Sequence, residues 1–148
     1  MASTQFVMKL QEQIGHEFGA HQQYVAIATY FDALTMPQMA ALFYAQALEE
    51  RDHAMMMVRY LLDQGEEVAI PALDAPKMDF ADVIEPVKLA LDQEKRVTSQ
   101  INELTRVARE DSDFASDQFM QWFIKEQVEE VAKMGDLLAV VTRAKGDL

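Results

Sequence analysis

Hydrophobic residues recur every three or four positions along four long segments of the chain, which is the period of an amphipathic helix. Glycine and proline are scarce, with 5 and 4 residues, which counts against a β-rich fold with many turns. Where they occur, several stand at the breaks between segments, as they do at helix ends. We expect helices from Thr4 to Ala33, from Thr35 to about Gly65, from about Asp82 to Glu110, and from the cap residues 111–113 to about Thr142.

The segments are joined by two short connections and one long one. Residues 66–80 contain Pro71 and Pro76 and show no helical period. Helices of about 25 to 30 residues are roughly 40 to 45 Å long, so a connection of this length can run back along the bundle and leave the second and third helices parallel. We therefore expect one all-α domain over residues 1–148, a four-helix bundle with one long crossover. A plain up-and-down bundle is the alternative.

Each of the four apolar stripes is interrupted near its midpoint by a glutamate. The interrupting residues are Glu17, Glu50, Glu94 and Glu130, and His53 follows Glu50 three residues later on the same face. No lysine or arginine lies on these stripes. Because an unpaired carboxylate costs roughly several kcal/mol to bury, we expect cations to enter the middle of the bundle.

The charge of these groups suggests how many cations to expect. Four glutamates carry four negative charges, which two divalent ions balance, so a dinuclear site is predicted. Oxygen ligands with one imidazole suit iron or manganese, with zinc as a competitor. Any one of these acids, taken alone, could equally be an exposed residue on a helix face that has been assigned wrongly. Four at one depth, together with a Glu-x-x-His pair, make that reading improbable.

Several neighbouring residues have two readings. Tyr24 is either an ordinary core aromatic or a hydrogen-bonding or redox partner of the acid on its own helix. Glu49, Glu126 and Glu129 flank the stripes by one residue, where glutamates are ordinarily solvated. Together with Glu130 they are candidates for a third, weaker cation.

Composition supports cations as the partners. There are 25 acidic residues against 13 basic ones, for a formal charge of -12, and no basic cluster that would follow a phosphate backbone, so direct nucleic-acid binding is disfavoured. The absence of cysteine excludes thiolate metal sites and disulfides. The chain shows no signal-peptide pattern and no uncharged apolar run long enough to span a membrane, so we expect a cytoplasmic protein without a membrane partner.

The residues singled out above resemble the ferroxidase motifs of bacterial non-haem ferritins. Glu17, Tyr24, the run Glu50-Arg51-Asp52-His53, Glu94 and the run Glu126-Gln127-Val128-Glu129-Glu130 match that family in order and spacing. The resemblance covers nearly the whole chain and implies a ferritin-like four-helix bundle. It also implies a ferroxidase that oxidises Fe(II) to Fe(III) with O2 or H2O2 and stores the product as a mineral inside a homo-oligomeric shell of 24 subunits.

The resemblance also implies roles for single residues. Glu17, Glu50 and His53 would hold the first iron, with Glu50 bridging to the second. Glu94 and Glu130 would hold the second iron, with Gln127 beside it. Glu49, Glu126, Glu129 and Glu130 correspond to a third iron site.

Two departures from related families bear on these expectations. Haem-binding bacterioferritins carry a second Glu-x-x-His in the fourth helix and a methionine after the bridging glutamate, whereas this chain has Gln127-x-x-Glu130 and Arg51. No haem is therefore expected. Ferritins of this kind usually add a short fifth helix around four-fold pores, and this chain stops at Leu148, so we expect four helices and a shell that would have to close without the fifth.

The residues leave other functions open. One is a di-iron oxidase or peroxide scavenger that stores nothing, and another is a metal-free acidic helical scaffold. A DNA-shielding miniferritin is less favoured, because the set Glu17, Glu50 and His53 lies within one chain.

The first helix predicts association between copies of the chain. Between Glu17 and Asp32 it carries no charged residue, and the side opposite Glu17 presents Gly15, Gly19, Ala26 and Ala33. A face exposed to water normally carries charge. We therefore expect a neighbouring subunit to cover it.

Overall fold

The computed structural model describes residues 2–144 and 147, and within them it contains four helices and no strand. The helices are α1 (Thr4–Ala33), α2 (Pro37–Asp63), α3 (Glu85–Glu110) and α4 (Phe114–Arg143). All four predicted helices are confirmed, with differences only at the ends. No fifth helix occurs in this part of the chain, and none of these helices is long and apolar enough to cross a membrane.

The helix ends follow from local hydrogen bonds. Asp113 caps α4, since its Oδ1 accepts from the backbone N–H of Ser116. Asp82 lies in the turn before α3, where its Oδ1 accepts from the backbone N–H groups of Ile84 and Glu85. Gly65 takes a positive φ of 77° just after α2, as a C-terminal glycine does. Thr35 does not cap α2 as expected, because it adopts φ 59° in the turn after α1.

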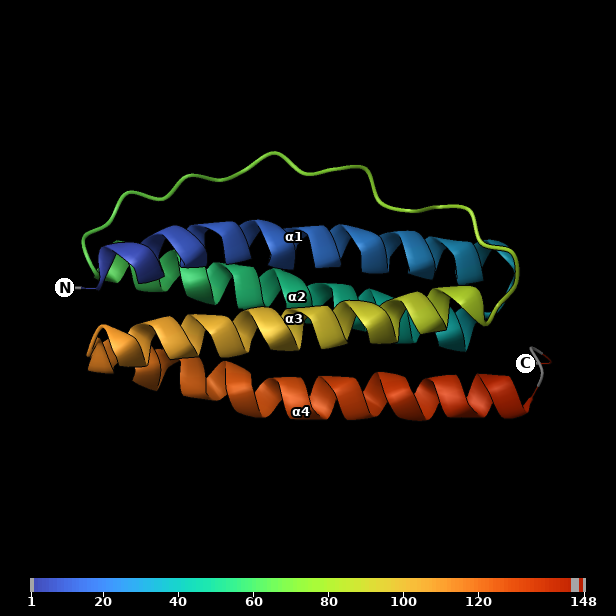
Figure 1. The fold of residues 1–148 in the computed structure, drawn as a ribbon. Coiled ribbons are helices and arrows are strands. Elements are labelled where there is room, and N and C mark those ends of the chain that lie inside the picture. The colour runs from blue at the N-terminus through green and yellow to red at the C-terminus, as the bar shows by residue number, and fades with distance from the viewer. Residues whose placement is uncertain (1, 145–146, 148) are drawn as a thin grey trace.

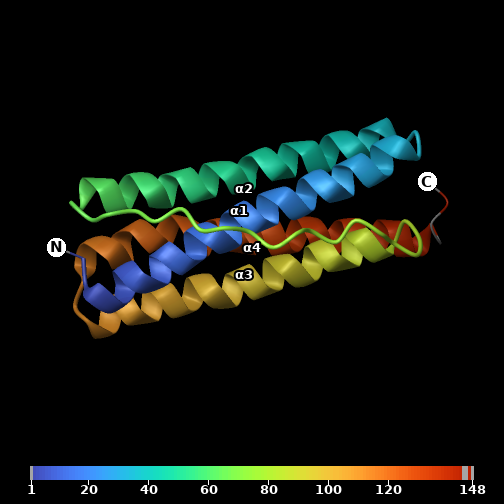
Figure 2. The ribbon, with the colours of Figure 1, turned by 90° about the horizontal axis from the view of Figure 1, so that it is seen from above.

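The long connection makes the second and third helices parallel. α1 and α2 form one antiparallel hairpin, and α3 and α4 form another (Figure 1). Between them, residues 64–84 run the length of the bundle along the outside of α1, so that α3 starts near the end where α2 starts (Figures 1 and 2). The predicted crossover topology is confirmed, and a plain up-and-down bundle is excluded.

Two glutamines of α1 hold this crossover in place. The side-chain amide of Gln11 donates to the carbonyl of Glu67 at 2.6 Å and accepts from the N–H of Ala69 at 3.1 Å. Twelve residues later, Gln23 makes the same pair of bonds to the carbonyl and N–H of Lys77, at 2.8 and 2.9 Å. Each amide thus satisfies both a donor and an acceptor of a backbone that has no sheet or helix partner.

The crossover also corrects one expectation about α1. A Cβ added at Gly15 would lie 2.9 Å from Pro71 Cγ, so the chain's own crossover, and not a neighbouring subunit, covers that glycine. Ala26 is likewise buried within its own chain, whereas Ala33 is exposed. A Cβ added at Gly19 would meet no atom within 4 Å, so Gly19 is the one glycine of that face left open. The crossover thus covers the Gly15 end of this face, and association of a second copy at Gly19 and Ala33 stays a prediction.

The apolar core is split into two clusters at opposite ends of the bundle. On α1, for example, one cluster reaches Ile14 and the other begins at Tyr24, and every helix shows the same gap. Buried polar side chains occupy the gap and its edges. They are Gln13 and Glu17 of α1, Gln46, Glu50 and His53 of α2, Glu94 of α3, and Gln127 and Glu130 of α4.

Candidate di-metal centre

The four glutamates that interrupt the apolar stripes meet in the middle of the bundle. Glu17, Glu50 and Glu94 have no exposed surface, and Glu130 is 2% exposed. Two groups have ligand atoms within 4.8 Å of one another. The first is Glu17, Glu50 and His53, and the second is Glu50, Glu94 and Glu130. Because Glu50 belongs to both, the arrangement is two adjacent ligand sets with one shared carboxylate.

The first ligand set has almost no internal hydrogen bonds. Both carboxylate oxygens of Glu17 are buried without a hydrogen-bond partner among the described residues, and so are Glu50 Oε2 and His53 Nδ1. The last two atoms lie 3.3 Å apart, but not in hydrogen-bonding geometry. Buried polar atoms are nearly always paired. Four unpaired atoms aimed at one spot are what an open coordination position requires.

The second ligand set is supported by hydrogen-bond donors. The hydroxyl of Tyr24 donates to Glu94 Oε1 at 2.7 Å, and the amide of Gln127 donates to Glu94 Oε2 at 3.2 Å. The amide of Gln46 donates to Glu50 Oε1 at 3.2 Å and, more closely, to Glu130 Oε2. These donors orient the carboxylates, as the residues around metal ligands commonly do.

The titration of these groups reflects their burial. Burial, reinforced by the charge of Glu50, raises the pKa of Glu17 well above its usual value and that of Glu94 to about 9. Burial also raises the pKa of Glu130 to about 7, although Lys133 acts in the opposite direction. Burial would raise the pKa of Glu50 too, but its contacts with His53 lower it overall. Without cations, protons must therefore neutralise much of the centre.

A family comparison can now be set beside this geometry. A family model described as a ferritin-like domain matches residues 7–144. This chain belongs to the ferritin family. The match spans nearly the whole chain and includes all four helices of the bundle almost from end to end.

Curated ferritins are similar over nearly the same length. Ferritin BfrB of Mycobacterium tuberculosis is 53% identical over 145 residues, which cover 98% of this chain and 80% of the relative. A bacterial non-heme ferritin of Staphylococcus aureus is 37% identical over 147 residues, covering 99% of this chain and 89% of the relative.

Solved ferritin structures have the same fold. The open-pore ferritin of the archaeon Archaeoglobus fulgidus superposes with a TM-score of 0.92 at 30% identity, over 94% of this chain and 86% of that one. A closed form engineered from the same ferritin gives 0.94 over 99% of this chain and 89% of that one.

The structure brings together most of the residues singled out in the sequence. Tyr24, Gln127 and the five residues of the two ligand sets lie in one layer. Glu49 and Glu126 form a further group with Glu130, whose ligand atoms also lie within 4.8 Å of one another. Glu129 is exposed and does not belong to that group.

Two polar residues of this ferritin centre escaped the sequence analysis. Gln46 lies one helical turn before Glu50 on the same stripe, where an amide looks less significant than an acid. Lys133 lies beside the stripe of α4, and its ammonium nitrogen reaches 3.5 Å from Glu130 Oε1 and 3.4 Å from Glu49 Oε2. The absence of basic residues from the stripes therefore did not mean their absence from the centre, because a long lysine side chain can reach sideways.

His53 is enclosed by aromatic rings. The ring of Trp122 stands edge-on to His53 with centroids 5.4 Å apart, and that of Phe123 at 6.0 Å. These contacts restrict the rotation of the imidazole and leave Nδ1 facing Glu50. Trp122 itself is 45% exposed, so it lies between the histidine and the surface.

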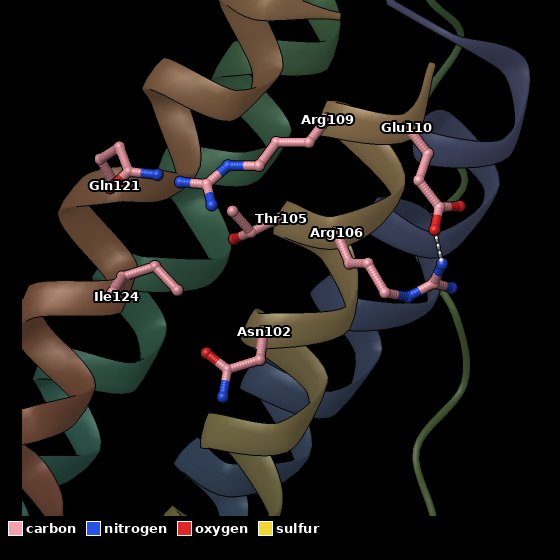
Figure 3. A pocket seen from close by; sticks show the side chains of 7 residues that line it. All are labelled: Asn102, Thr105, Arg106, Arg109, Glu110, Gln121 and Ile124. Atoms are coloured by element: carbon pink, nitrogen blue, oxygen red, sulfur yellow. Dashed lines mark hydrogen bonds and ion pairs between the residues drawn. The ribbon is translucent and has the colours of Figure 1, made fainter. Parts of the chain in front are cut away.

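A surface groove elsewhere on the ferritin bundle is unrelated to this centre. It opens between α3 and α4 near their connecting turn, with a volume of about 330 Å³ (Figure 3). Its two arginines are already paired, Arg106 with Glu103 and Glu110, and Arg109 with Asp117. The groove contains no ligand of the centre; its lining residues are Asn102, Thr105, Arg106, Arg109, Glu110, Gln121 and Ile124.

Proposed function

We propose that this member of the ferritin family is a ferroxidase that oxidises Fe(II) at the buried centre and stores the Fe(III) as a mineral. Iron is the substrate of this reaction. Glu17, Glu50 and His53 bind the first Fe(II), and Glu50, Glu94 and Glu130 bind the second. The observation that carries the proposal is the pair of buried ligand sets that share Glu50, one of them with both oxygens of Glu17 unpaired.

The donor atoms fit iron. Four carboxylates and one imidazole provide four negative charges, which two Fe(II) ions neutralise without any proton. Carboxylate oxygens are hard anionic ligands that favour Fe(III) over Fe(II), so they favour oxidation. The names of the relatives, ferritin and bacterial non-heme ferritin, support the same metal. The haem ligand expected of bacterioferritins is replaced by Arg51, and we propose no haem.

The reaction balances with the two irons as the only reductant. Each Fe(II) gives one electron to O2, which takes up two protons and leaves as H2O2, so two Fe(II) yield two Fe(III) per cycle. With H2O2 as the oxidant, the same two electrons and two further protons yield two molecules of water. Glu50 contacts both positions and therefore holds the two reductants next to each other.

Storage requires more than one chain. We propose that the chain forms a homo-oligomeric shell, with 24 subunits by analogy with its family, and that Fe(III) leaves the centre for its interior. Glu49, Glu126 and Glu130, with Glu129 beside them, are the residues of a third and weaker iron position, which is separate from the two tight ones.

Stopped-flow absorbance after addition of Fe(II) in air tests the oxidation, and the iron content per oligomer tests the storage. We expect rapid oxidation at two Fe(II) per chain, followed by accumulation of mineral in an assembly measured by light scattering. Rapid oxidation without mineral would instead identify an oxidase that stores nothing. No tight binding of two ions per chain would refute the centre itself.

A further inference from the structure

Lys133 places a positive charge at the position where a third cation would bind. It lies on α4, three residues after Glu130, with 40% of its side chain exposed. Its ammonium nitrogen donates to Gln46 Oε1 at 2.8 Å and lies 3.4 Å from Glu49 Oε2 and 3.5 Å from Glu130 Oε1. The ammonium therefore sits among three oxygen atoms from α2 and α4.

Two of those oxygens belong to the third carboxylate group. Glu49 and Glu130, with Glu126, are the residues whose ligand atoms converge beside the di-metal centre. A metal ion bound to carboxylates needs oxygen atoms at about 2.0 to 2.6 Å. It would have to occupy nearly the same space as the ammonium, and the two positive charges would repel each other. Lys133 and a third cation therefore exclude each other.

The lysine also determines how Gln46 is turned. An amide has a donor end and an acceptor end, and the contact with Lys133 selects Oε1 to face outward. The amide nitrogen then faces inward and donates to Glu50 and Glu130. Through Gln46, Lys133 thus affects Glu50, the shared carboxylate, and Glu130 of the second ligand set. It does so without contacting Glu50 itself.

We propose that Lys133 is a positioning residue whose ammonium occupies the third cation position, so that the chain holds two cations tightly and the third only weakly. This inference rests on the proposed function, since it concerns an ion beside the ferroxidase centre. In turnover, an Fe(III) leaving the centre meets a positive charge and not a vacant carboxylate site. The lysine consequently favours transfer of iron to the mineral over retention beside the centre.

Calorimetric titration of the assembled apo protein with Zn(II) tests this inference without any iron oxidation. The variants are Lys133→Met and, as a matched control, Lys125→Met, which removes the same charge from a position on the same helix outside the third carboxylate group. We expect two tight ions per chain in the wild type and in Lys125→Met. In Lys133→Met a third ion should bind at least about tenfold more tightly than in the wild type, because removal of a unit charge at such distances is worth about 1.4 kcal/mol or more.

Two further variants locate the third ion. Adding Glu49→Gln to Lys133→Met should remove the third ion and leave the two tight ones. Lys133→Arg keeps the charge and should behave as the wild type does. Circular dichroism of every variant checks that the helices are intact, and Lys133→Gln provides an independent neutral side chain.

The possible outcomes separate this inference from the proposed function. Equal third-ion affinity in the wild type, Lys133→Met and Lys133→Gln would overturn the role of Lys133, even with two tight ions in each. Failure of all variants and the wild type to bind two ions would overturn the proposed function. A merely structural lysine would change the melting temperature but not the number of bound ions.

Discussion

The two halves of the buried centre are built from the same kinds of ligand but are supported very differently. On the α1–α2 side, Glu17 has no hydrogen bond among the described residues. On the α3–α4 side, Glu94 accepts from Tyr24 and Gln127, and Glu130 accepts from Gln46. The first half therefore needs a cation or a proton to neutralise its carboxylates. In the second half, hydrogen bonds from the protein already stabilise part of the carboxylate charge. We therefore expect the α1–α2 half to bind metal through carboxylate oxygens that have no other partner. The α3–α4 half should bind it through carboxylates that hydrogen bonds already hold in place.

The largest expected effect is the loss of His53, a ligand of the first set, or of Glu50, which both sets share. We expect His53→Ala, or Glu50→Ala, to slow rapid Fe(II) oxidation more than about a hundredfold, because even the partners of metal ligands are worth 10- to 100-fold. Asp52→Ala is the matched control, since Asp52 is exposed and pairs only with Arg51 in the described part of the chain. Stopped-flow absorbance measures the rates. Rates in His53→Ala equal to those of Asp52→Ala would contradict the assignment.

Stability without metal should show the contrast directly. We expect Glu17→Leu to stabilise the apo protein by about 1 to 4 kcal/mol, because it removes an unpaired buried carboxyl. Glu94→Leu should gain less, since it leaves the buried Tyr24 hydroxyl without its acceptor, at a penalty of about 1 to 3 kcal/mol. Urea unfolding of the apo variants measures both. An equal gain in the two variants would show that the donors around Glu94 contribute nothing.

The pH dependence of apo stability has a definite sign. The pKa of Glu94 is about 9 in the folded chain against an ordinary value of 4.5, so between these values the folded state holds a proton that the unfolded chain has released. Stability should therefore fall as pH rises from 4.5 to 9, by up to about 1.4 kcal/mol per unit for this group, and Glu130 adds to the fall up to about pH 7. Scanning calorimetry across this range measures the slope.

Added metal should stabilise the protein more at high pH than at low pH, opposite to the trend of the apo protein. Zn(II) or Co(II) replaces the protons on Glu17, Glu94 and Glu130, so the gain in melting temperature on adding metal should grow with pH. Glu94→Gln serves as the control, because it keeps the shape of the side chain but should flatten the apo slope. A gain that shrinks with rising pH would mean that the ions bind elsewhere.

The smallest expected effect is on the donor to the second half. In Tyr24→Phe the pKa of Glu94 should rise further, because the hydrogen bond from Tyr24 acts to lower it. We expect the second metal ion to bind about tenfold more weakly, which is the lower end of the effect of losing one hydrogen bond to a charged group. Metal titration at about pH 7 measures it, with the first ion as an internal reference. A weakened first ion would indicate a general disturbance of the bundle.

The helices and the candidate ligands of this centre were predictable because they share one signal. A glutamate in an apolar stripe is costly to bury, so its repetition at one depth in four helices identified Glu17, Glu50, Glu94 and Glu130 as members of one site. The structure places them together, and the fold that this requires is confirmed.

The supporting residues gave no comparable signal. An amide such as Gln46 interrupts a stripe without a charge, and Lys133 lies off the stripe and enters through the reach of its side chain. The topology of the crossover was predicted, but the residues of α1 that it contacts were not, since residues 66–80 have no periodicity. The pairing of Gly15 with Pro71 therefore became apparent only from three-dimensional contacts.

The division of the bundle into two hairpins has a consequence for how it holds together. Glu17, Glu50 and His53 belong to the α1–α2 hairpin, and Glu94, Gln127 and Glu130 belong to the α3–α4 hairpin. The crossover, residues 64–84, is the one covalent tether between them. A cation shared by Glu50 and Glu94 would be a second, reversible cross-link at mid-height. If the chain were cut in the crossover, the two hairpins would be separate fragments held together in part by the bound cation. Their association would then depend on the metal concentration as well as on the concentration of the fragments.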